Sequence, residues 1–141
     1  MQNKTEYGCA LVVNTEDIHP EIVSQMTGIN STFVTIKGCP RIHRRTGIEI
    51  AGTSNIENNW ILDSGKYYQT EWELEQAIVK IIDMINLYDS FHNVFLRFKN
   101  SKLLCYAYVQ HYNISFILSP KLIESVLKLN IPIEFDLYSL E

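Results

Sequence analysis

One apolar stripe constrains the fold of this chain more than any other sequence feature. Between residues 71 and 88, apolar side chains recur every three and four residues, which is the period of one helix face. The stripe consists of Leu74, Ala77, Ile78, Ile81, Ile82 and Ile85. Thr70 and Glu73 form a capping box at the start of the predicted helix. Such a helix must cover its stripe with another element, and most segments around it have strand character.

Strand and helix patterns alternate along the rest of the chain. Residues 7–13 predict a strand whose small residues, Gly8 and Ala10 with Val12, favour a helix packed on their face. Further strands are predicted over residues 33–36, 60–62, 94–98, 103–111, 114–118 and 133–138, with a hairpin turn at 99–102 and a second turn near 112–113. Helices are predicted over 20–28, ended by a left-handed Gly28, and over 119–129, capped by Ser119 and ended by Asn130. This order predicts an α+β fold, with an antiparallel or mixed sheet of about six to seven strands and three helices. We expect a ferredoxin-like βαββαβ core plus a βαβ-type C-terminal extension, in a single domain over residues 1–141.

The composition is that of an ordinary folded domain. The 141 residues include 12 basic and 16 acidic side chains, which gives a formal net charge of −4. No apolar run approaches the ~20 residues of a membrane span, and the polar first residues are unlike a signal peptide. The three cysteines include no C-x-x-C pair, and Cys9 and Cys105 lie in apolar runs that predict burial. These features predict a bacterial cytoplasmic protein that is not held together by disulfides.

The C-terminal part of the chain resembles a known bacterial family. The resemblance is carried by Leu118-Ser119-Pro120-Lys121-Leu122-Ile123, Leu127-Lys128-Leu129 and Ile131–Tyr138, and earlier by Pro20, Thr27-Gly28-Ile29, Lys37-Gly38 and Trp60–Ser64. On these residues the chain is identified as a member of domain-of-unknown-function family 4279, over nearly its whole length. His19 departs from the family pattern, which has Asp, a better helix cap, at this position. The resemblance supports the fold and implies no activity, substrate or cofactor.

The sequence contains no common catalytic or metal-binding motif. It has no G-x-x-x-x-G-K-[ST], G-x-G-x-x-G, H-E-x-x-H or G-x-S-x-G pattern. Cys39 and His43 have a spacing suited to metal binding, but they supply only half of a zinc ligand set. Cys39 beside Arg41 could be a reactive thiol, and the simpler interpretation is an ordinary loop cysteine.

Three carboxylates are candidates for acid–base chemistry. Glu134 and Asp136 lie in a predicted strand and Asp63 directly follows one, and alternation places all three towards solvent. We expect them to pair across the sheet with Arg97 or Lys99. Nothing in this set selects a reaction, so we predict a protein that is not an enzyme and that uses no cofactor or metal.

One segment is strongly basic. Residues 37–45 carry four positive charges and no acid, so the rest of the chain sums to −8. The candidate partner-binding residues are Lys37, Arg41, His43, Arg44, Arg45 and, at the edge of the segment, Trp60. The segment is either a solvated loop or a docking patch for a phosphate, an acidic protein or a nucleic acid. A nucleic acid is the least favoured partner, because the sequence pI is near 5.5 and a short patch reaches few phosphates.

Two classes of function remain open on this sequence. The first is a non-catalytic protein-binding module, for instance an immunity-type protein that neutralises a toxin, because Trp, Tyr and Arg anchor such interfaces. The alternative is a small-molecule-binding domain or a weak enzyme with a pocket near the basic segment and Trp60. A homodimer formed through an exposed sheet edge is a further expectation.

Overall fold

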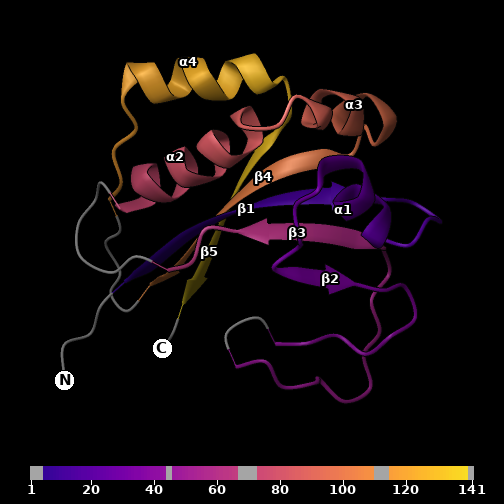
Figure 1. Cartoon of the computed structure of the whole chain (residues 1–141). Helices are drawn as coiled ribbons and strands as arrows, with labels where there is room; N and C mark the ends of the chain where they lie inside the picture. Colours follow the sequence, from indigo (N-terminus) through magenta and orange to yellow (C-terminus); the bar gives the residue numbers. More distant parts are fainter. Residues whose placement is uncertain (1–4, 44–45, 67–72, 110–114, 140–141) are drawn as a thin grey trace.

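The structure is a computed structural model that describes residues 5–43, 46–66, 73–109 and 115–139. Five strands and four helices are present in these ranges (Figure 1). Their order is β1 (Glu6–Asn14), α1 (Glu21–Thr27), β2 (Phe33–Thr35), β3 (Asn59–Asp63), α2 (Glu73–Asn86), α3 (Ser90–Arg97), β4 (Ser101–Val109), α4 (Pro120–Leu129) and β5 (Ile133–Ser139). The α+β class is confirmed. The predicted six to seven strands and three helices are not.

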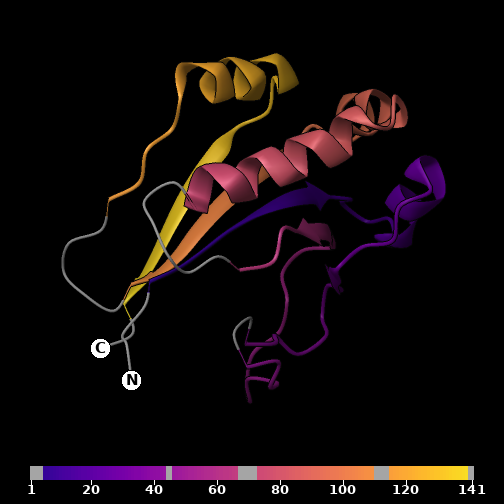
Figure 2. The same ribbon diagram turned by 60° about the vertical axis from the view of Figure 1, so that its left-hand side comes forward.

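The strands form one mixed sheet in the order β2-β3-β1-β4-β5. Every neighbouring pair is antiparallel except β4 and β5, which run parallel and are joined through α4. Two parallel neighbours need a long crossover connection, and α4 supplies it. Figures 1 and 2 show α2, α3 and α4 on one side of the sheet, and residues 37–43 and 46–58 on the other.

The predicted strand over residues 94–98 is wrong, because this segment belongs to α3. Phe91, Val94, Phe95 and Phe98 recur at helical spacing, and the first, second and last of them are buried in the core. Leu96, which the strand pattern placed with Val94, is 60% exposed. A short apolar run fits both the helix period of 3.6 residues and the strand period of two. Here the burial of one helix face decides for the helix. Residues 99–100 therefore join a helix to β4 and are not a hairpin turn.

Other local expectations have mixed outcomes. Ser119 caps α4 by accepting a hydrogen bond from the Leu122 amide, and left-handed residues Gly28 and Asn130 end α1 and α4, as predicted. The predicted strand at residues 114–118 is wrong over its described part, which is irregular and packs Phe116 on Phe135. The capping box at residues 70–72, the turn at 112–113 and residue 114 lie outside the described residues.

The core lies between the helices and one face of the sheet. Tyr7, Cys9, Leu11 and Val13 of β1 are buried there against the apolar stripe of α2. The expectation that a helix covers the small residues of β1 is wrong, because the helices pack on the opposite face. We call the face without helices the back face; its centre is a small apolar cluster of Ala10, Val12, Ile61 and Leu104.

The predicted burial of two cysteines is confirmed. Cys9 and Cys105 are directly paired across β1 and β4, with their sulfur atoms 4.0 Å apart. The Cys105 side chain, together with burial, raises the pKa of the Cys9 thiol well above its ordinary value. Because a protonated thiol is a poor nucleophile, this pair acts as part of the core. Among the described residues, no helix is long and apolar enough to cross a membrane.

Candidate functional site

The basic segment forms one side of a hairpin-like arm. We call residues 37–58 the arm; residues 44 and 45 lie outside its described part. The Ile50 amide donates to the Arg41 carbonyl and the His43 amide to the Ile48 carbonyl, both at 2.8 Å. Between these bonds, Ile42 and Glu49 form an antiparallel bridge. The basic segment therefore has a short ladder of backbone hydrogen bonds that fixes Arg41 and His43 on one side of the arm.

Two asparagines hold the base of the arm. Asn55 exchanges backbone hydrogen bonds with Gly38 and Cys39, at 2.9 and 2.8 Å. Asn58 accepts from the Lys37 amide through its side-chain oxygen and donates to the Glu16 carbonyl, both at 2.8 Å. Asn side chains that bond to nearby backbone are typical of ordered loops. The base is thus fixed to the ends of β1, β2 and β3.

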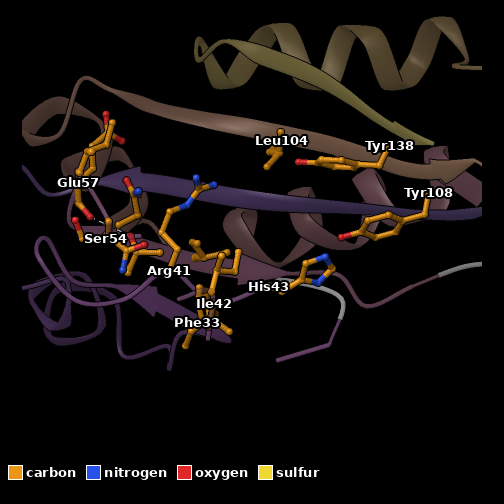
Figure 3. Close-up of a pocket in the computed structure, with 15 residues that line it drawn as sticks. Phe33, Arg41, Ile42, His43, Ser54, Glu57, Leu104, Tyr108 and Tyr138 are labelled. Atoms are coloured by element: carbon orange, nitrogen blue, oxygen red, sulfur yellow. Dashed lines mark hydrogen bonds between the residues drawn. The ribbon is translucent and has the colours of Figure 1, made fainter. Parts of the chain in front are cut away.

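A cleft of about 520 Å³ lies between the arm and the back face of the sheet. The arm contributes Arg41, Ile42, His43, Ile50, Ser54, Asn55, Ile56 and Glu57, and the sheet contributes Phe33, Thr35, Asn59, Ile61, Leu104, Tyr108 and Tyr138. Figure 3 shows Arg41 extending from the arm towards the sheet, with Ile42 and Phe33 beside it. Its size and its mixture of apolar walls and a few polar groups are typical of a small-molecule site.

The polar groups of the cleft can hold an anion. Arg41 forms no ion pair or side-chain hydrogen bond within the described part of the chain. The His43 Nδ1 atom accepts a hydrogen bond from the Thr46 amide at 3.4 Å, which leaves Nε2 as the ring nitrogen available to a ligand. Tyr138 stacks on Tyr108 with ring centroids 5.2 Å apart, and these rings give the cleft an aromatic end (Figure 3). Cation, imidazole and aromatic rings thus face one space.

The structure divides the candidate residues that the sequence predicted. Arg41 and His43 line the cleft, Lys37 is exposed on the arm outside it, and Arg44 and Arg45 lie outside the described residues. The prediction that Trp60 contributes to the site is wrong. Its side chain is fully buried on the helix side of the sheet, where Nε1 donates to Ser24 Oγ at 2.9 Å.

Sequence reasoning missed the wall that the sheet contributes. Leu104 and Tyr108 on β4 and Tyr138 on β5 face the cleft because alternate residues of paired strands share a face. The alternation was visible in the sequence. The sequence does not show which face of the sheet the helices cover, so these residues could not be assigned to a site.

The three candidate carboxylates have structural partners. Asp63 accepts from the Tyr106 hydroxyl at 2.7 Å, and Asp136 accepts from the Tyr138 hydroxyl. Glu134 pairs with Lys102 at 2.6 Å, so the expected pairing with Arg97 or Lys99 is wrong for this residue. Among the described residues, no three His, Cys, Asp or Glu side chains are gathered as a metal ligand set.

A second cavity, of about 390 Å³, lies where α2, α3 and the end of α4 meet. Its lining includes Asp89, His92 and Lys128 as well as apolar residues such as Phe95. Lys128 of this cavity is already paired with Glu124. The first cavity, with its unpaired guanidinium, is therefore the stronger candidate.

A family model described as Domain of unknown function (DUF4279) matches residues 5–140. The chain belongs to this family. The match confirms the resemblance found in the sequence and spans all strands and helices of the DUF4279 domain as well as the arm. No curated protein and no solved structure matches the chain significantly.

Proposed function

We propose that this DUF4279 domain is a non-catalytic binding domain that holds a small organic anion in the cleft beneath the arm. The observation that carries this proposal is the Arg41 guanidinium, which reaches towards an apolar sheet face without an ion-pair partner in the described residues. Arg suits planar, bidentate contact with a carboxylate, sulfonate or phosphate. The apolar centre of the cleft suits the body of the same molecule.

We infer further that β1 to β4 and their helices make a ferredoxin-like unit. The support is the order β2-β3-β1-β4, in which β3 lies between β1 and β2, and β1 lies between β3 and β4. That unit hosts many unrelated functions. The functional proposal therefore depends on the cleft and not on the fold.

The proposal predicts that a charged probe binds more tightly than its neutral twin. Anilinonaphthalene sulfonate and N-phenylnaphthylamine share an aromatic body and differ by the sulfonate, and both report binding by fluorescence. We expect Arg41→Gln to weaken binding of the sulfonate about ten-fold and to leave the neutral probe unchanged, because a charge-assisted hydrogen bond contributes about 1.5–3 kcal/mol. The matched control is Lys121→Gln, which removes one exposed positive charge on α4, away from the cleft.

The readout separates this site from general attraction of an anion to the protein. Equal losses in the Arg41 and Lys121 variants would show that only net charge matters and would refute the proposal. The same conclusion follows if wild-type protein binds both probes equally.

A second candidate function is binding of an acidic protein by the outer surface of the arm. Ile48 is 67% exposed and lies outside the cleft, next to the basic segment that includes Lys37. An immunity-type role in the bacterial cytoplasm is the specific form of this proposal, with a toxin as the partner. Ile48→Ser should abolish recovery of a stoichiometric acidic partner in a pulldown while probe binding in the cleft persists. Recovery that is unaffected by this change would exclude the outer surface as the interface.

A further inference from the structure

We infer that the ligand of this cleft is dipolar, with a cationic group that meets Glu57 and an anionic group that meets Arg41. The inference rests on the proposed function, because it concerns the same cleft. Its basis is that side chains of opposite charge, Arg41 and Glu57, line the same cleft. Glu57 lines the cleft at the end opposite to His43 and the tyrosines (Figure 3).

The position of Glu57 is fixed by its backbone. The Glu57 carbonyl accepts a hydrogen bond from Thr35 Oγ1 at 3.1 Å. The next residue, Asn58, accepts from the Lys37 amide and so holds the base of the arm. Within the described residues its carboxylate enters no ion pair, with Arg41 or with any other cation. Two charges of opposite sign thus line one cleft without neutralising each other.

The cleft also has apolar surface beside the two charges. Phe33, Ile42, Ile61 and Leu104 supply the surface there. A simple anion at Arg41 would gain one attraction and would also feel repulsion from the Glu57 carboxylate. A molecule with an ammonium group at one end and a carboxylate at the other would satisfy both charges and place its apolar chain on the centre.

The length of the cleft favours an elongated ligand. Asn59 is paired with Asn14 of β1, and Tyr108 is paired with Glu6 of the same strand. These levels are separated by eight residues along β1, which is about 27 Å in an extended strand. The cleft therefore has room for a dipolar molecule with an apolar chain between its two charges, such as an ω-amino acid.

The test compares 8-aminooctanoate with octanoate, which lacks the ammonium group, by titration followed in amide NMR spectra. We expect the dipolar probe to bind about two- to five-fold more tightly, since an exposed ion pair contributes up to about 1 kcal/mol. Glu57→Gln should abolish this advantage. Glu49→Gln is the matched control, because Glu49 is an exposed acid of the same arm that does not line the cleft.

The outcomes distinguish this inference from the proposed function. Equal affinity for the two probes in wild-type protein, with both still weakened by Arg41→Gln, would overturn the dipolar ligand and leave the anion site standing. An advantage that survives Glu57→Gln would also overturn it. If neither probe perturbs the amides of the arm and neither depends on Arg41, both proposals fail together.

Discussion

Trp60→Ala should lower the free energy of unfolding by about 3–5 kcal/mol, the range found when a fully buried large aromatic residue is truncated in a core. The Trp60 side chain has no exposed surface and packs on Phe91, with ring centroids 6.1 Å apart. Its removal also takes the hydrogen-bond donor away from the Ser24 hydroxyl, which is buried beside it. Urea denaturation followed by circular dichroism measures the change.

The same variant tests whether Trp60 belongs to the site. Because the indole lies on the helix side of the sheet, probe affinity of the folded fraction should not change. Where Trp60→Ala fails to fold, Trp60→Phe retains most of the buried area and should cost about 1–2 kcal/mol less than truncation. A stable Trp60→Ala protein that has lost only probe binding would show that Trp60 is a ligand contact after all.

Gly8→Ala should destabilise the protein by about 3 kcal/mol, although it adds a single methyl group. The Tyr106 side chain of β4 crosses β1 at Gly8, and its hydroxyl reaches Asp63 on β3 at 2.7 Å. A Cβ atom at position 8 would clash with the hydroxyl end of the Tyr106 ring, 2.6 Å from Cε2. The buried ring would have to leave, which adds the loss of a charge-assisted hydrogen bond to the overpacking cost of about 1–3 kcal/mol.

A double-mutant cycle identifies the cause. In a Tyr106→Leu background the ring is absent, so Gly8→Ala should cost less than about 0.5 kcal/mol or stabilise the strand, where Ala is preferred to Gly. Tyr106→Phe provides a control that keeps the ring and removes only the hydroxyl. Equal effects of Gly8→Ala with and without the Tyr106 ring would refute the crossing as the reason for glycine.

Local sequence signals predicted the elements that depend on neighbouring residues. The stripe of α2, the Ser119 cap and the Gly28 stop are properties of a few consecutive residues, and all three are present in the structure. The prediction for residues 94–98 is wrong because their apolar residues fit both the strand and the helix period, and only contact with the core favours the helix. The extra helix and the smaller number of strands follow from the segments misread at 94–98 and 114–118.

The candidate site shows the same division. The basic character of residues 37–45 is the only signal that predicts Arg41 and His43 as site residues, and both line the cleft. Glu57 attracted no attention, because an acid in a polar segment has no distinguishing pattern. Trp60 was wrongly assigned to the site, and Tyr108 was not assigned to it. Each lies in a strand, and the sequence does not say which face of a strand the helices cover.

The sequence by itself determined the family, the α+β class, the principal helix and the position of an uncompensated basic segment. Those features follow from composition and from spacing over a few residues. Only the tertiary structure decided which face of the sheet the helices cover, and hence that Trp60 is core while Tyr108 and Tyr138 line the cleft. The physical reason is that a strand's alternation specifies two faces equally well. Which one is buried depends on where α2 and α3 pack, and that is set by contacts between segments far apart in the chain.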